Sequence, residues 1–277
     1  MKNLLFTFFV LFLVSDLSAQ QLLWSDDFSN PSTWVIGTNG QGSFIIGDNL
    51  DPGITSQVQY MGEMETNGTS AANGFAFFNG VEYLLNADVD PQDTWVQSGT
   101  IDLSSYGVVK LIFNQRYRAF NFDETSVEVS QDGGQTWTSY PVNLDVITND
   151  PGVQNTISIN ISVNQSESTV IRFRWVSDSA EDSYGSGYGW MVDDVSIQAL
   201  PSYDAQLTEV IAGSEPFPSL TDRQHSQYTQ IPIGQIAPID FSGVIENAGT
   251  SAINTTFTAN IPGVYSGVSN PSNIVPT

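Results

Sequence analysis

Hydrophobic and polar residues alternate one by one along much of this chain. In residues 157–161 isoleucines alternate with Ser and Asn, and in residues 171–175 apolar side chains alternate with two arginines. A period of two places successive side chains on opposite faces of a β-strand, whereas helical periodicity is nearly absent. The pattern therefore predicts an all-β protein.

Turn clusters rich in Gly, Pro, Asn and Asp separate the strand-like segments. Many short strands with turn signals between them are typical of a β-sandwich or barrel. We predict a jelly-roll β-sandwich over residues 20–199. Its further strands are expected at 22–28, 43–46, 74–79, 108–113, 126–130 and 188–198.

The composition changes near Leu200-Pro201-Ser202, where a second module is expected to begin. A strand is predicted over 203–210, and residues 239–247 and 251–261 have the pattern of a hairpin. This suits an immunoglobulin-like domain over residues 200–277. Because such a sandwich needs about 100 residues, we expect the domain to be incomplete and the sequence to be a piece of a longer protein.

Residues 1–19 have the order of a secretory signal peptide. Lys2 supplies a positive charge, residues 4–14 are apolar except for Thr7, and Ala19 offers a small residue for cleavage. The apolar run is shorter than the roughly 20 residues that span a bilayer. We predict a secreted or cell-surface protein without a transmembrane segment in its mature chain. The alternative is a buried N-terminal strand or helix.

The formal net charge of −23 limits the possible partners. Such a surface repels phosphate backbones and anionic membranes, so we predict no nucleic-acid binding. The absence of cysteine excludes disulfides and cysteine-ligated zinc. No pattern in the chain specifies an oligomeric state.

Catalytic constellations are scarce. His225 is the single histidine and lies in a polar stretch without a Gly-x-Ser-x-Gly elbow, which disfavours a Ser-His-Asp triad. A glycosidase needs two carboxyl groups about 5–10 Å apart, and Glu63 with Glu65 could share a strand face. Exposed strand acids explain that pair as well, so we predict no catalytic residues. A carbohydrate hydrolase remains the alternative.

Residues 130–137 resemble the Asp-box pattern Ser-x-Asp-x-Gly-x-Thr-Trp. We predict a structural turn in which Asp132 accepts amide hydrogen bonds, Gly134 permits positive φ, and Trp137 packs beneath the turn. The alternating Arg116, Arg118, Arg172 and Arg174 suit either a carboxylate-binding cluster or arginines that face solvent.

Two acids near the ends of the first module are expected to face its core. Strand alternation places Asp26 with Trp24 and Phe28, and Asp193 with Met191. A core-facing carboxylate is costly unless it is paired, so a calcium ion between the two is one prediction. Strand-end capping, or a bulge that turns the acids to solvent, is the alternative. Further candidate ligands are Asp27, Asp194, Asp48 and Asp51.

Residues 182–190 form a Gly-rich segment that carries Tyr184, Tyr188 and Trp190. Aromatic faces suit sugar C–H surfaces, so these three residues are candidates for a glycan platform. The alternative is that Trp190 starts a core strand.

Four segments resemble, in order, the landmarks of MAM-like "choice-of-anchor" jelly-roll modules. They cover residues 23–28, 98–104, 127–137 and 189–197. Residues 203–207 and 246–250 are similar to the opening of a CARDB-like, immunoglobulin-like adhesion domain.

The resemblance implies an extracellular adhesion or substrate-binding segment whose ligand is a glycan or a protein. Members are typically large surface proteins, sometimes joined to peptidases and often exported by a type IX system with a C-terminal sorting domain. A structural cation at Asp26 and Asp193 fits this picture. The chain departs from it in showing no peptidase segment and no recognisable sorting domain. A structural spacer is a further hypothesis.

Overall fold

The computed structural model describes residues 20–48, 61, 73–81, 92–120, 123–146, 152–177, 187–213, 240–261 and 265–276. The chain divides into two compact units, Met1–Ala199 and Leu200–Thr277. Across the described ranges, no helix is long and apolar enough to cross a membrane.

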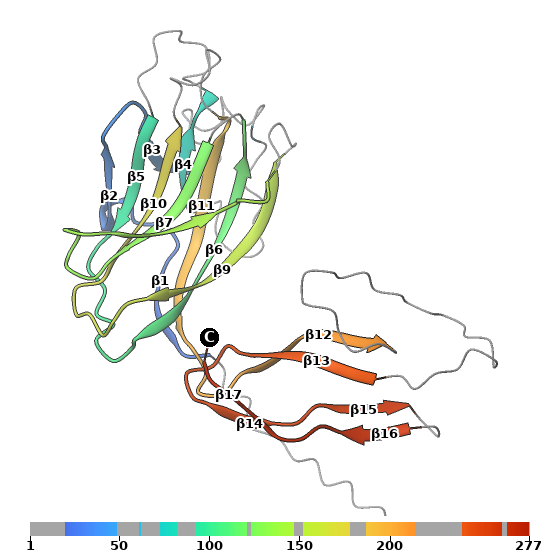
Figure 1. The fold of residues 1–277 in the computed structure, drawn as a ribbon. Helices are drawn as coiled ribbons and strands as arrows, with labels where there is room; N and C mark the ends of the chain where they lie inside the picture. Colours follow the sequence, from blue (N-terminus) through green and yellow to red (C-terminus); the bar gives the residue numbers. More distant parts are fainter. Residues whose placement is uncertain are drawn as a thin grey trace, which may run out of the picture. The chain divides into compact units, whose positions relative to one another are not determined.

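The first unit is a sandwich of two antiparallel sheets (Figure 1). One sheet has the order β3-β4-β11-β6-β9, with β1 beside part of β11. Its strands are β1 (Leu22–Asp26), β3 (Phe44–Gly47), β4 (Phe75–Asn79), β6 (Val108–Arg118), β9 (Val153–Ser162) and β11 (Gly189–Ala199). The other sheet has the order β2-β5-β10-β7-β8. Its strands are β2 (Trp34–Thr38), β5 (Gln92–Ser98), β7 (Asp123–Ser130), β8 (Thr138–Val142) and β10 (Val170–Ser177), and a 3-10 turn (Pro31–Thr33) precedes β2.

Aromatic rings fill the space between the two sheets. Phe173 of β10 meets Phe113 and Trp190 of the other sheet edge to face, with ring centroids 5.0 and 5.8 Å apart. Such pairs add to the free energy gained by burial alone. The alternation seen in the sequence explains this core, because Ile171, Phe173 and Trp175 are buried there. The prediction of an all-β sandwich is confirmed.

The second unit contains three two-stranded antiparallel sheets among its described residues. They pair β12 (Ala205–Gly213) with β13 (Asp240–Asn247), β14 (Ile253–Thr255) with β17 (Ser272–Ile274), and β15 (Thr258–Ile261) with β16 (Tyr265–Val268).

The hairpin predicted between residues 239–247 and 251–261 is wrong, because β13 pairs with β12 instead. The side-chain amide of buried Asn247 donates to the carbonyls of Ser251 and Ile274. These bonds tie the end of β13 to the neighbouring segments, and the chain that follows pairs with later strands.

Candidate functional site

The first and last strands of the sandwich lie side by side. β1 pairs with the second half of β11, whose first half pairs with β4. The register shifts between Asp193 and Ser196 at this change of partner, and Asp194 has a φ of 48°. A bulge re-aims side chains locally. Here it leaves Asp193 with no exposed surface and Asp194 partly exposed.

Asp26 has the partners of a strand-end cap. Its carboxylate accepts hydrogen bonds from the backbone N–H of Phe28 and the indole N–H of Trp34, both at 2.8 Å. Asp193 accepts a hydrogen bond from the backbone N–H of Asp194 at 2.7 Å. Asp26 at the end of β1 therefore has the donors of the capping alternative raised above, whereas Asp193 lies within β11 and not at a strand end.

An open hollow lies beside these strands. It is lined by Leu22, Ser25, Asp26, Asp27, Asp194, Val195 and Ser196. Asp27 accepts from Asn73, and hydrogen bonds, chiefly with Ser29, lower its pKa. No group of three His, Cys, Asp or Glu in the described ranges is placed to hold a metal ion. Asp48 does not line the hollow, Asp51 lies outside the described residues, and calcium stays a prediction.

The predicted glycan loop is only partly described. Trp190 has no exposed surface, and its indole N–H donates to Gln115 at 2.8 Å, so the core interpretation holds for this residue. Tyr188 is half-buried beneath the Arg118 guanidinium, 3.7 Å from its ring centroid. Tyr184 lies outside the described residues, as do Glu63, Glu65 and His225.

A larger group of polar and aromatic side chains covers the outer surface of the five-stranded sheet. Successive residues of a β-strand face opposite sides of the sheet. The strands that bury Val96, Val127 and Phe173 in the core therefore present the residues next to them on the outer surface. We call this surface the tryptophan–arginine face. It consists of Asp93 and Trp95 from β5, Glu128 from β7, Arg172 and Arg174 from β10, and Trp137 from the turn before β8.

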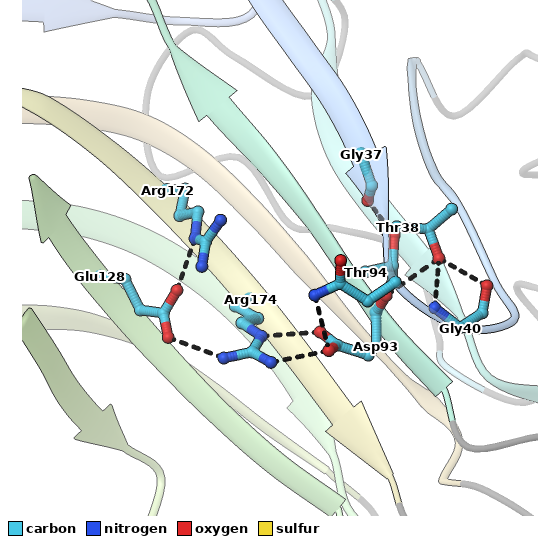
Figure 2. A network of polar contacts seen from close by, with 9 residues as sticks. Gly37, Thr38, Gly40, Asp93, Thr94, Glu128, Arg172 and Arg174 are labelled. Atoms are coloured by element: carbon cyan, nitrogen blue, oxygen red, sulfur yellow. Dashed lines mark hydrogen bonds and ion pairs between the residues drawn. The ribbon is translucent and has the colours of Figure 1, made fainter. Parts of the chain in front are cut away.

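Ion pairs cross the face from strand to strand (Figure 2). Arg174 binds Asp93 through two hydrogen bonds of 2.7 Å each and Glu128 through a third of 3.0 Å. The other Glu128 oxygen accepts from the Arg172 Nε at 2.5 Å. Register brings Arg172 directly opposite Glu128 in the β10–β7 pair, and Arg174 reaches Glu128 and Asp93 diagonally.

The two carboxylates of this network are partly or largely buried and each has an arginine partner. The Glu128 side chain is only 6% exposed, so its two arginine partners are what make its burial tolerable. Burial alone would raise the pKa of Asp93, but hydrogen bonds from Arg174 and Asn39 outweigh burial and hold the pKa below its ordinary value. The formal charges of the two arginines and the two carboxylates sum to zero.

Two indoles flank the Arg172 guanidinium. Its central carbon lies 4.0 Å from the ring centroid of Trp137 and 4.7 Å from that of Trp95. Both tryptophans are partly exposed. The Trp95 ring leans over Gly37 of β2, where a Cβ would lie 2.5 Å from the indole. Cation–π contacts of this kind hold a guanidinium against the faces of aromatic rings.

The turn over residues 130–137 positions Trp137. The Asp132 carboxylate accepts from the backbone N–H groups of Gln135 and Thr136, both at 2.9 Å, and from the Thr136 hydroxyl. These bonds lower the pKa of Asp132, the Thr136 hydroxyl most of all. Gly134 has a φ of 95°, in the left-handed region that favours glycine, and its Cβ position lies 3.6 Å from the Trp137 ring.

Sequence reasoning missed the tryptophan–arginine face as a site. It treated Arg172 and Arg174 as a carboxylate-binding cluster or as arginines facing solvent, and it did not consider Trp95. The overlooked signal is a large aromatic residue at an outward position of a strand, opposite in register to a charged residue. Exposed aromatic residues on an otherwise polar face are a common mark of binding.

No protein-family model matches the chain, and no curated protein matches it. The MAM-like and CARDB-like resemblances therefore stay predictions. Several solved β-sandwich domains are similar in backbone arrangement. The K1 cleaved adhesin domain of Lys-gingipain from Porphyromonas gingivalis is 16% identical, with 64% of this chain and 97% of that chain covered and a TM-score of 0.40. A mannan-recognising carbohydrate-binding module is also 16% identical, with 66% and 99% covered and a TM-score of 0.36. A xylan-binding domain is 8% identical, with 66% and 96% covered and a TM-score of 0.38.

Proposed function

We propose that this chain is an extracellular, non-catalytic binding module that holds a glycan on the tryptophan–arginine face. The observation that carries the proposal is the Arg172 guanidinium held between two partly exposed indoles. Indole faces pack against the C–H surfaces of sugars, and a fixed guanidinium orients hydroxyl groups. Aromatic side chains with a few precisely placed polar groups are typical of ligand sites.

The acids of this face are unsuited to glycoside hydrolysis. A glycosidase needs one carboxyl group that donates a proton and a second carboxylate across the scissile bond. Asp93 forms a two-bond ion pair with Arg174, and Glu128 bridges both arginines. Both carboxylates serve as partners of arginines, which favours binding over catalysis.

Binding to a panel of neutral and acidic polysaccharides, measured by affinity electrophoresis, tests this proposal. We expect retention of the purified protein by at least one polymer. Trp137→Ala should weaken that retention about tenfold or more, because it removes an indole from the contact surface. Tyr203→Ala is the matched control, since Tyr203 is a 67% exposed aromatic residue of the other unit. Equal losses in the two variants would place the ligand elsewhere.

A protein ligand and a purely structural spacer are the competing functions. Retention by no polysaccharide, together with an unaltered melting temperature in their presence, would favour one of these two. Secretion rests on residues 1–19, which lie outside the described residues, and is tested by the N-terminal sequence of the exported protein.

The calcium prediction concerns stability at the β1–β11 edge and is separate from glycan binding. A bound ion stabilises the folded state in proportion to the logarithm of its concentration. If calcium binds near Asp26 and Asp193, the melting temperature rises on titration with calcium and falls with a chelator. An unchanged melting temperature would leave Asp26 as a strand-end cap alone.

A further inference from the structure

We infer that the ligand of the tryptophan–arginine face is a neutral glycan whose hydroxyl oxygens accept hydrogen bonds from the terminal nitrogens of Arg172. This inference rests on the proposed function. It adds the chemical class of the ligand and the protein group that forms hydrogen bonds with it. It follows from three features of the face: its donors, their rigidity and their charge.

The two arginines of the face use their donors differently. All three nitrogens of Arg174 bind carboxylates, through Nε and one Nη to Asp93 and through the other Nη to Glu128. Arg172 binds Glu128 through Nε. Its two Nη atoms form no hydrogen bond with any residue that the structure describes. Neither Nη atom is among the fully buried polar atoms without a partner. In Figure 2 a dashed line reaches the Nε of Arg172 but neither of its two terminal nitrogens, whose N–H groups are therefore available to a ligand.

These N–H groups are held in one place. Glu128 fixes the Nε of Arg172, and the indoles of Trp95 and Trp137 flank the guanidinium plane. The Arg172 side chain is 11% exposed, so its mobile stem is already packed against the sheet. A guanidinium is a planar fork that matches a pair of acceptor oxygens, and a fork that is already ordered loses little entropy on binding. Two neighbouring hydroxyls of one sugar ring offer such a pair.

Charge separates a neutral ligand from an acidic one. A carboxylate also matches the guanidinium fork, but the positive charge of Arg172 is already balanced within the network of Glu128, Arg174 and Asp93. The face therefore has no net positive charge to offer, and the whole chain carries −23. The field of such a protein repels anionic polymers and leaves neutral ones unaffected. Hydroxyls are thus the acceptors that the face favours.

Matched neutral and oxidised polymers test the inference on the unaltered protein. Soluble glucan, mannan and galactan are compared by calorimetry with the same polymers after oxidation of their primary alcohols to carboxylates. We expect at least one neutral polymer to bind more tightly than its oxidised form, with an affinity that changes little between low and high salt. Preference for an oxidised form, weakened by salt, would overturn the inference while leaving glycan binding intact. Binding of no polymer would overturn the proposed function as well.

The variant Arg172→Lys distinguishes the contribution of the paired guanidinium donors from that of the positive charge. Lysine keeps the positive charge beside Glu128 but loses the paired donors, so we expect affinity for the neutral polymer to fall about tenfold. Affinity for the oxidised polymer should change little. Retained neutral affinity in a folded Arg172→Lys variant would contradict the assigned role of Arg172. If this variant does not fold, the salt dependence and the polymer pairs still decide the inference on the unaltered protein.

Discussion

Glu128 is the residue on which the charge network of the tryptophan–arginine face depends most. Its carboxylate lies between Arg172 and Arg174, and its side chain is only 6% exposed. Glu128→Gln keeps the shape but replaces one accepting oxygen by an NH₂ group that faces a guanidinium. Removing one partner from a buried ion pair costs about 3–5 kcal/mol.

The expected loss for this variant is smaller than that range. Arg174 keeps its two hydrogen bonds to Asp93 and is 26% exposed, while Arg172 keeps both indoles. A destabilisation of about 2–3 kcal/mol follows from this partial compensation. For a domain of this size each kcal/mol lowers the melting temperature by about 2–4 °C, so a decrease of roughly 5–10 °C is expected.

Thermal unfolding followed by circular dichroism at pH 7 measures this decrease. Glu124→Gln is the matched control, because Glu124 lies on the same strand and the same face but is exposed. Substitutions at such surface positions usually change stability by less than about 0.5 kcal/mol. If the two variants melt at the same temperature, Glu128 does not hold the arginines as described, and the fixed guanidinium loses its support.

Three further predictions concern other parts of the sandwich. Burial raises the pKa of Asp123 to about 7, above its unfolded value near 3.9, so the free energy of unfolding should fall as pH rises from about 4 to about 7. Urea midpoints at pH 5 and pH 8 measure this fall, which Asp123→Asn should largely abolish. Asp132→Ala should lower the urea midpoint at pH 7 because it removes the acceptor of the turn amides, and an unchanged midpoint would show that the glycines hold the turn alone. Gly37→Ala should displace the Trp95 indole and weaken glycan binding. Gly99→Ala is the control, because its Cβ would meet no atom closer than 3.9 Å, and it should leave binding unchanged. Equal affinities of the two variants would show that the position of Trp95 is unimportant.

The sandwich was predictable because its core follows from strand periodicity. Ile171, Phe173 and Trp175 alternate with polar residues in the sequence and are buried in the structure. This result depends on local patterning, which a single sequence carries.

Which residues of neighbouring strands lie opposite each other was not predictable in the same way. Register is set by the whole sheet, so the sequence does not show that Arg172 lies opposite Glu128 or that Trp95 lies opposite Gly37. The same reason explains the wrong hairpin after Asn247, since local turn chemistry does not say which later strand a segment joins. The site is built from these cross-strand neighbours, and for that reason it was missed.

The indole N–H resonances of the protein provide the most direct test of where the glycan binds. In a titration with a neutral polysaccharide that the panel identifies, the account predicts that the signals of Trp95 and Trp137 move with ligand concentration. The signals of Trp175 and Trp190 should stay in place, because their N–H groups donate to Gln92 and Gln115 inside the core. Saturable binding that leaves Trp95 and Trp137 unmoved would contradict the central claim.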